Sequence, residues 1–196
     1  AGGLSSVMPM YVASRLRLPM VDADGMGRAF PELQMTLFTA HGITATPFAM
    51  SDERGNVLLM NTITNKWTET FARSIVVNMG AMSMVALYSA TIKQLKQAAI
   101  PGTITLAETI GKAIRHARTE EANPVEALCQ SVGAFLLFKG KLSDVNRKIQ
   151  GGWNLGEARL EGVDSYSGRS IIIHFQNENL GVSEQGEFLV TTPDLI

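Results

Sequence analysis

The chain has 196 residues, the length of one ordinary domain or two small ones. Hydrophobic residues make up 45% of it and charged residues only 18%, whereas about a quarter is usual for soluble domains. This composition excludes intrinsic disorder and indicates that much of the surface is covered by another part of a larger protein or by a partner. Because the formal net charge is −1 and no basic cluster is present, neither nucleic acid nor a membrane is an expected partner.

A single cysteine, Cys129, excludes an internal disulfide and any metal site built from several cysteines. The start of the chain has no signal-like sequence, so we expect a cytoplasmic location. The longest uncharged window spans residues 74–92, and polar side chains such as Asn78 and Ser83 interrupt it. We interpret this window as a buried helix that runs into a buried strand.

The N-terminal part of the chain predicts a helix, a short strand and a second helix. Ser6 is a good N-cap for a helix that runs to about Arg17. Residues 18–22 are predicted to form a short buried strand, which ends in a turn rich in aspartate and glycine. Pro31 can begin the next helix, and Gly42 is its expected C-terminal stop.

Strands and helices continue to alternate up to Val132. Two apolar runs within residues 45–60 flank Gly55-Asn56, a sequence typical of a hairpin turn. The pattern then predicts a helix from Asn65 to Gly80, a strand at 82–88, a helix at 91–99, a helix opened by the capping box of Thr105 and Glu108, and a helix opened by Asn123-Pro124. This alternation predicts a layered α/β domain over residues 1–139.

The sequence changes in character after Gly140. Glycines separate short runs of alternating polarity, among them 157–163, 170–176 and 187–192. Short strands at regular spacing, with turn residues between them, predict a small all-β domain, a barrel or a sandwich, over residues 140–196.

The densest group of polar residues follows the first predicted strand. Asp22 and Asp24 lie two residues apart, so their side chains point to the same side of a strand and can converge where it ends. Two close carboxylates can share a proton, one acting as a general base, or can bind a divalent cation such as Mg²⁺ or Mn²⁺. Glu32 is a candidate third oxygen ligand, and Arg28 can neutralise the pair or hold a planar anion by two parallel hydrogen bonds. The alternative is an aspartate–arginine network that ties the loop to the next helix.

The glycines of this loop do not indicate a dinucleotide site. Gly25 and Gly27 have the spacing that opens a dinucleotide fingerprint, but Phe30 stands where its third glycine is needed. Two aspartates would also repel a pyrophosphate. We therefore expect neither NAD nor FAD at this loop, and a divalent cation is the one cofactor that the residues suggest.

Two further segments carry candidate ligand-binding groups. Gly2, Gly3, Ser5 and Ser6 stand at a helix N-terminus, where free N–H groups favour an anion or a polarised carbonyl oxygen; the alternative is an ordinary capped helix. The tetrad that ends in Asn177-Glu178-Asn179 follows an apolar strand, and it either projects into a cleft between the two domains or forms a turn. The three histidines, His41, His116 and His174, have no partner at metal-ligand spacing.

Several of these segments, taken together, resemble the sequence pattern of a known family. Residues 2–6 and 19–35, with the shorter runs 100–103, 138–141, 175–180 and 193–196, resemble a bacterial family found with hydantoin-utilisation proteins and named after an S-methyl-thiohydantoin desulfurase. The resemblance spans essentially the whole chain, and its stretch from Asp22 to Gln34 is long and specific. It implies a Rossmann-like α/β part followed by a β-rich part. Members usually begin with a further α/β segment that holds a glycine-rich loop and continue with more strands, so the resemblance implies a fragment of a longer protein.

These features lead to two functional hypotheses. The first is a hydrolase-like enzyme acting on a hydantoin or thiohydantoin type of cyclic amide, with Asp22 and Asp24 as bases or metal ligands, and with Arg28 and the helix start at residues 2–6 holding the ring. The second is a non-catalytic binding or assembly subunit that works beside a hydantoinase or an oxoprolinase. The low share of charged residues further predicts a homo-oligomer or another protein partner.

Overall fold

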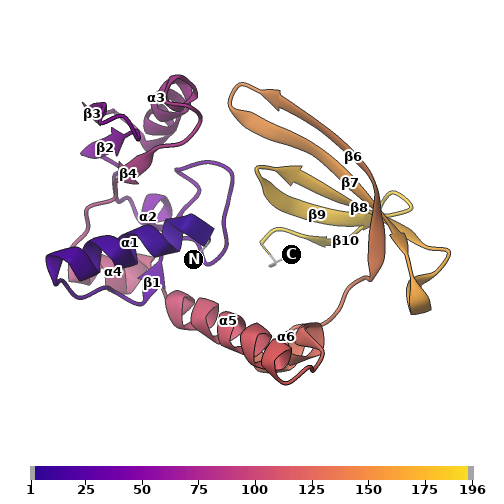
Figure 1. Cartoon of the computed structure of the whole chain (residues 1–196). Coiled ribbons are helices and arrows are strands. Elements are labelled where there is room, and N and C mark those ends of the chain that lie inside the picture. The colour runs from indigo at the N-terminus through magenta and orange to yellow at the C-terminus, as the bar shows by residue number, and fades with distance from the viewer. Residues whose placement is uncertain (1–2, 194–196) are drawn as a thin grey trace.

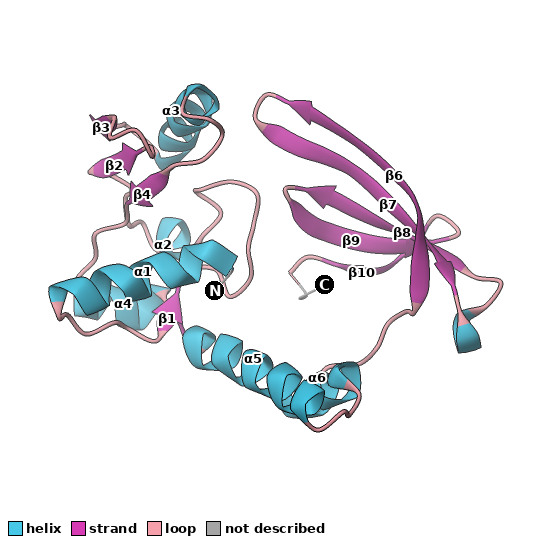
Figure 2. Ribbon diagram, in the orientation of Figure 1, coloured by secondary structure: helices cyan, strands magenta, loops and turns pink. Residues whose placement is uncertain are grey.

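The structure, a computed structural model, describes residues 3–193 (Figures 1 and 2). Its helices are α1 (Gly3–Leu16), α2 (Leu37–Ala40), α3 (Asn65–Asn78), α4 (Ile92–Ala98), α5 (Thr103–Thr119) and α6 (Pro124–Val132). Its strands are β1 (Ala23–Asp24), β2 (Phe48–Ser51), β3 (Val57–Met60), β4 (Met84–Ala86), β5 (Ile100–Pro101), β6 (Gly140–Gln150), β7 (Trp153–Gly162), β8 (Ser170–Gln176), β9 (Glu178–Glu184) and β10 (Glu187–Thr191). A short 3₁₀ helix at Asp164–Tyr166 follows β7.

The described strands form three separate sheets, in the orders β1-β5, β3-β2-β4 and β10-β9-β8-β7-β6. Every described strand pair is antiparallel. Figure 1 shows the three-stranded sheet and α3 at the upper left and the five-stranded sheet on the right, with α5 and α6 leading from one part to the other. The molecule therefore has two parts. One contains the two small sheets, the other contains the five-stranded sheet, and the chain passes from the first to the second through α5 and α6.

The predicted Rossmann-like layering is wrong. A Rossmann domain stacks helices on both faces of one parallel sheet, whose strands are joined by helical crossovers. Before Gly140 the described strands have only two to four residues and belong to two small antiparallel sheets. Helices and strands do alternate along the chain, but strands of this length pair locally and build no continuous parallel sheet.

The β-rich part after Gly140 is confirmed, although its predicted closure is not. The five strands run as a meander, with each strand paired to the next along the chain. Because β6 and β10 are the two edges of this sheet, the described residues form an open sheet rather than a barrel. A hairpin turn at Gly151-Gly152, where both φ angles are positive, joins β6 and β7.

The predicted hairpin within residues 45–60 is confirmed as β2 and β3, and it contributes to a small hydrophobic core. Phe48 and Met50 alternate along β2 and are fully buried against Ala72 of α3. The second core gathers Ile43, Ala45, Tyr88 and Ala98. Both cores lie before Gly140 and support the loop that precedes α2.

Two predicted strands differ from the structure. Residues 18–22 form no strand, and Leu18 and Val21 are exposed. The strand pairing described in this region begins one residue later, where β1 pairs with β5. The strand predicted at 82–88 shortens to β4, whose residues are exposed rather than buried. No described helix combines the length and the apolar character that crossing a membrane requires.

The start of α5 also differs from its prediction. The expected capping box of Thr105 and Glu108 is absent, since the N-cap of the helix is Gly102, three residues before Thr105. Gly102 has a φ of 77°, a left-handed conformation that glycine adopts without steric cost. A distant side chain, that of Asp22, binds the free N–H groups of this helix end.

Candidate functional site

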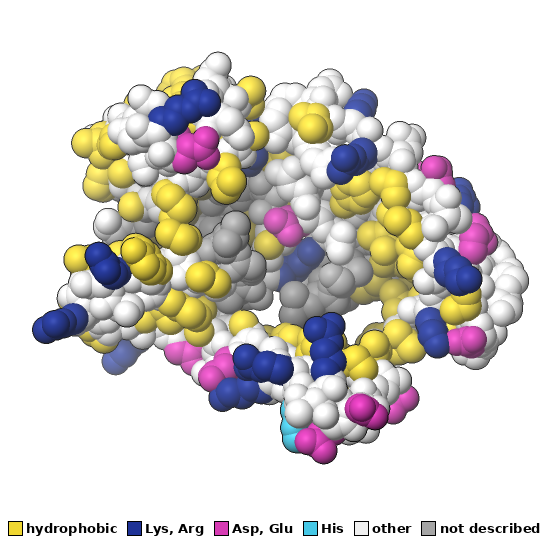
Figure 3. All heavy atoms as spheres, viewed as in Figure 1, with side chains coloured by type: hydrophobic (Ala, Val, Ile, Leu, Met, Phe, Trp, Pro, Cys, Tyr) yellow, Lys and Arg dark blue, Asp and Glu magenta, His cyan; other side chains and the backbone are white. Residues whose placement is uncertain are grey.

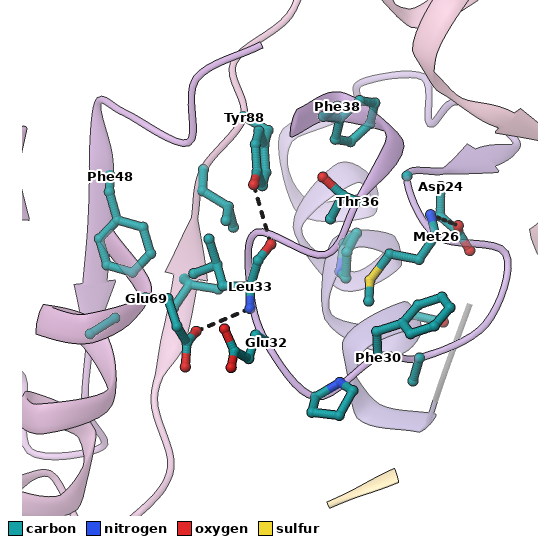
Figure 4. A pocket seen from close by; sticks show the side chains of 18 of the residues that line it. Asp24, Met26, Phe30, Glu32, Leu33, Thr36, Phe38, Phe48, Glu69 and Tyr88 are labelled. Atoms are coloured by element: carbon teal, nitrogen blue, oxygen red, sulfur yellow. Dashed lines mark hydrogen bonds between the residues drawn. The ribbon is translucent and has the colours of Figure 1, made fainter. Parts of the chain in front are cut away.

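A cavity of about 700 Å³ lies between the loop that precedes α2, helix α3, strands β2 and β4, and Glu178 of β9. This volume is typical of small-molecule sites in proteins. Most of its wall is apolar and includes Met26, Phe30, Leu33, Phe38, Phe48, Met50, Val76, Val85 and Leu87. Its polar groups include Asp24, Arg28, Glu32, Thr36, Glu69, Arg73 and Tyr88, several of which are drawn in Figure 4. A few polar groups on an apolar wall are the usual composition of a ligand pocket.

Asp24 shapes the loop that forms one side of this cavity. Its Oδ1 accepts hydrogen bonds from the amides of Met26, at 2.7 Å, and Gly27, at 2.6 Å. Gly27 has a φ of 74°, and a Cβ on Gly25 would lie 2.7 Å from the Phe38 ring. The aspartate and the two glycines therefore fix a tight turn over Phe38, and N–H donors of this kind stabilise the ionised carboxylate.

Asp22 contacts a different element from Asp24. Its Oδ1 accepts from the amides of Ile104, at 2.9 Å, and Thr105, at 3.1 Å, and its Oδ2 accepts from the Thr105 hydroxyl at 2.6 Å. Hydrogen bonds from the hydroxyl and amide of Thr105, with that from Ile104, hold the pKa of Asp22 below its ordinary value. Asp22 thus binds the N-terminus of α5, where a negative charge also complements the helix dipole.

The three predicted carboxylates, Asp22, Asp24 and Glu32, accept hydrogen bonds from separate donors in the part of the chain that the structure describes. Within residues 3–193, no group of three His, Cys, Asp or Glu side chains is arranged to hold a metal ion. Glu32, the candidate third ligand, instead accepts hydrogen bonds from Lys66 and Gln34. These two donors hold the pKa of Glu32 below its ordinary value, so the side chain is ionised at neutral pH.

Arg28 is buried in the wall of the cavity, with only 7% of its surface exposed. Its Nη2 donates to the backbone carbonyl of Asn179 at 2.6 Å, and its guanidinium lies over the Phe30 ring at 5.2 Å. Nε and Nη1 are buried and have no hydrogen-bond partner. A buried cation with unused donors is exceptional in a folded protein and is characteristic of a ligand-binding group.

Two residues of α3, Glu69 and Arg73, form hydrogen bonds with the same loop. They were not identified from the sequence as site residues. Glu69 accepts from the amide of Leu33 at 3.0 Å and from Nε of Arg73 at 2.8 Å, and the Leu33 carbonyl accepts from the Tyr88 hydroxyl (Figure 4). Arg73 also donates to the carbonyl of Pro31. The spacing of Glu69 and Arg73, four residues apart on a helix, was the available signal, since such pairs meet on one helix face.

The remaining predicted site residues have separate surroundings. Gly2 lies outside the described residues. Gly3 begins α1, but the structure does not describe its surroundings or the side chain of Ser5. Ser6 lines the cavity, as does Glu178. Asn177 forms the turn between β8 and β9, with a φ of 57° and an Oδ1 that accepts from the Asn154 amide at 2.8 Å. The predicted roles of these residues in binding remain predictions.

A second polar cluster, also missed, crosses three strands of the large sheet. Nε2 of His174 lies 2.8 Å from Oγ of Ser183, and its Nδ1 lies 3.2 Å from a carboxylate oxygen of Glu157. The order of hydroxyl, imidazole and carboxylate matches that of a hydrolase triad. Ser183 is only 6% exposed and does not line the cavity, so we assign the cluster to holding the strands together.

Comparisons with known proteins assign the chain to a family. The family model described as the S-Me-THD-like N-terminal domain matches residues 1–62, and that of the S-Me-THD-like C-terminal domain matches residues 63–196. The chain belongs to the S-methyl-thiohydantoin desulfurase-like family. The name of this family indicates a thiohydantoin-related function.

The S-methyl-thiohydantoin desulfurase-like chain is also similar to a solved structure. The crystal structure of a protein from Chromobacterium violaceum has 27% sequence identity and a TM-score of 0.70, and the match covers 93% of this chain and 50% of that one. The chain therefore spans about half the length of this relative. None of the curated proteins matches it.

Proposed function

We propose that this chain provides the substrate cavity of a hydrolase-like enzyme that acts on cyclic amides of the hydantoin or thiohydantoin type. The observation that carries the proposal is the cavity of about 700 Å³, whose apolar wall presents one buried guanidinium and an ordered carboxylate, in a chain of this family. A five-membered ring with two polar edges suits such a wall, because its faces pack on apolar side chains while its edges require hydrogen bonds.

The proposed reaction adds water to a carbonyl or thiocarbonyl carbon of the ring. The adjacent C–N bond breaks, and the proton that the water loses passes through a carboxylate to the leaving nitrogen. Asp24 is the proposed general base, because its carboxylate lines the cavity and two backbone amides hold it in place. Asp22, the second member of the predicted pair, has a positioning role, since it ties the same segment to α5.

The test is turnover by the purified chain of hydantoin, thiohydantoin, S-methyl-thiohydantoin and oxoproline, with and without Mg²⁺. Mass spectrometry detects the ring-opened acid, and thermal shift detects binding. If Asp24 is the general base, Asp24→Asn lowers turnover by about 100-fold or more while binding persists. Asp144→Asn removes an equivalent carboxylate from the exposed strand β6 and is the matched control. The absence of both turnover and binding for every ring would contradict the proposal.

A second candidate function is that of a binding or assembly subunit beside a hydantoinase or oxoprolinase. The observation in its favour is the accessible surface of 13020 Å², whereas a compact monomer of this mass exposes about 9,100 Å². A partner that covers part of this surface would account for the excess. Mixing the chain with a purified hydantoinase or oxoprolinase and measuring the mass of any complex by light scattering tests this candidate, and two separate species in each mixture would argue against it.

A further inference from the structure

We infer that Arg28 is the binding group for a singly charged, planar anion carried by the ligand of the cavity, an inference that rests on the proposed function and specifies its substrate. The anion is one that presents two acceptor atoms side by side. The inference starts from the burial of Arg28, from the cavity that its side chain lines, and from the two nitrogens that have no partner.

The hydrogen-bond donors of Arg28 can be counted. A guanidinium has five N–H groups and can hold a two-atom acceptor on either of two edges, Nε with Nη2 or Nη1 with Nη2. Each edge uses a different hydrogen of Nη2. The contact with the Asn179 carbonyl at 2.6 Å uses one of these hydrogens, so one complete edge with two parallel N–H groups remains, whichever hydrogen is engaged. Nε and Nη1, which complete the two edges, are both buried and unpaired.

The charge of Arg28 is also uncompensated. Its nearest described partners are a neutral carbonyl and the face of Phe30, and it forms no ion pair with a described carboxylate. Burial of a cation without a counterion is costly, because the interior replaces little of the hydration that the charge loses. The other guanidinium that lines the cavity, that of Arg73, is partly exposed and already pairs with Glu69. A ligand that brings one negative charge to Arg28 would therefore bind more tightly than its neutral analogue.

The remaining charges of the wall limit the ligand to a single negative charge. Glu69 and Glu32 pair with Arg73 and Lys66, and the cavity wall holds two more carboxylates, those of Asp24 and Glu178. A ligand with two negative charges, such as a phosphate ester, would be repelled by these further carboxylates. Two chemical sources can supply the required anion. One is the deprotonated imide of the ring itself, whose nitrogen and oxygen are adjacent acceptors. The other is a carboxylate on the ring substituent, as in a hydantoin made from an acidic amino acid.

Calorimetric titration with three hydantoins that differ at position 5 distinguishes these sources. The substituents are an acetate, its neutral acetamide and a methyl group, and each hydantoin is measured at pH 6 and pH 9. If the anion is a substituent carboxylate, the acetate binds at least tenfold more tightly than the acetamide at pH 6, where the ring imide is neutral. If it is the ring imide, the affinity for the acetamide and methyl compounds rises with pH. Equal affinities for all three at both pH values would overturn the inference.

Variants of Arg28 provide the second arm of this experiment. Arg28→Met removes the fork and the charge, whereas Arg28→Lys keeps the charge without the two parallel donors. The preference for the anion is expected to disappear in Arg28→Met and to weaken in Arg28→Lys. Because Arg28→Met also removes an uncompensated buried charge, its melting temperature without ligand should equal or exceed that of the wild type, which shows that it folds. Arg54→Met, on the exposed β2–β3 turn, is the control for the loss of one charge.

The outcomes for the inference and for the proposed function are separable. If the rings bind with no dependence on charge or on Arg28, the anion site is overturned and the cyclic-amide function stands. If simple carboxylates such as propionate bind through Arg28 while no ring compound binds, the anion site stands and the cyclic-amide function is overturned. An anion preference that survives unchanged in Arg28→Met would place the anion elsewhere and overturn the assignment to this residue.

Discussion

The ionised side chain of Glu32, which lines the cavity, stabilises the folded state. Hydrogen bonds from Lys66 and Gln34 hold its pKa below the ordinary value, so the folded state binds this proton less tightly than the unfolded state does. The stabilisation is therefore present above the ordinary pKa of glutamate and is lost as the pH falls through the lower, folded-state pKa. Because Lys66 is largely exposed, the contribution is about 0.5 kcal/mol rather than several.

Replacing Glu32 tests this pH dependence. Glu32→Gln is expected to be less stable than the wild type at pH 7 by about 0.5 kcal/mol, and the difference should shrink towards pH 3 as the wild-type carboxylate is protonated. Urea unfolding followed by circular dichroism at both pH values measures it. Glu108→Gln breaks an exposed pair with Lys112 on α5 and should change stability less at either pH. A difference that is the same at both pH values would contradict the assignment.

Ser183 supports His174 from within the sheet rather than acting as a nucleophile. Ser183→Ala leaves Nε2 of His174 without its buried partner at 2.8 Å and is expected to cost about 1–2 kcal/mol of unfolding free energy. Urea unfolding measures the loss. Since the hydroxyl is buried, a serine-directed fluorophosphonate should leave Ser183 unlabelled, and stoichiometric labelling at this residue would show instead that the cluster is a hydrolytic site.

At the scale of elements, the β6–β7 turn is joined to α3 by one arginine. Arg73 lies over the Trp153 ring at 4.0 Å and donates to the Gly152 carbonyl at 3.5 Å. A Cβ on Gly152 would lie 2.8 Å from Cδ of Arg73, so a side chain at this position would have to displace Arg73. The turn thus places the large sheet against the helix that also forms the wall of the cavity.

Alanine substitutions at two glycines separate this contact from backbone strain. Gly152 and Gly168 have φ angles of 79° and 83°, so an alanine at either position costs about 1 kcal/mol for the left-handed conformation. No atom lies within 4 Å of a Cβ on Gly168, so only Gly152→Ala should also displace Arg73. We expect Gly152→Ala to be the less stable variant and the only one to change Trp153 fluorescence, measured in a Trp67→Phe background. Equal effects would exclude the Arg73 contact as a determinant of the turn.

The elements that could be predicted from the sequence are those whose determinants are local. Thr64, Thr91 and Asn123 cap their helices through side chains that reach two or three residues along the chain, and the starts of α3, α4 and α6 were predicted within a residue or two. The start of α5 was not, because Asp22 binds it from 82 residues away. Likewise, Arg28 was a candidate, but its contact with Asn179 spans 151 residues and no local pattern predicts it. The failure of the Rossmann prediction has the same cause, since local periodicity indicates strands and not the pairing between them.

At the scale of the whole molecule, one face of the β3-β2-β4 sheet is apolar and uncovered. The strand register places Val57, Leu59 and Met84 on the face opposite α3, where they are 68%, 76% and 44% exposed. In Figure 3, hydrophobic side chains gather at the upper left, over these strands. A sheet packed on one side only, with an apolar outer face, is typical of a surface that another structure covers. This face contributes to the 13020 Å² of accessible surface, as do exposed apolar residues of other elements.

A charge placed on this face tests whether a second copy of the chain covers it. We expect the wild type to have at least the mass of a dimer in light scattering at micromolar concentration and Leu59→Glu to have the mass of a monomer, because a buried and unpaired carboxylate would destabilise the interface. Since Leu59 is 76% exposed in the single chain, Leu59→Glu should leave the monomer folded, with its circular dichroism unchanged. Gln97→Glu adds the same charge to an exposed position of α4 and should leave the mass of the wild type unaltered. A monomeric wild type, or a dimer that persists in Leu59→Glu, would show that a second copy of the chain does not cover this face. The apolar face would then be covered by a different kind of partner.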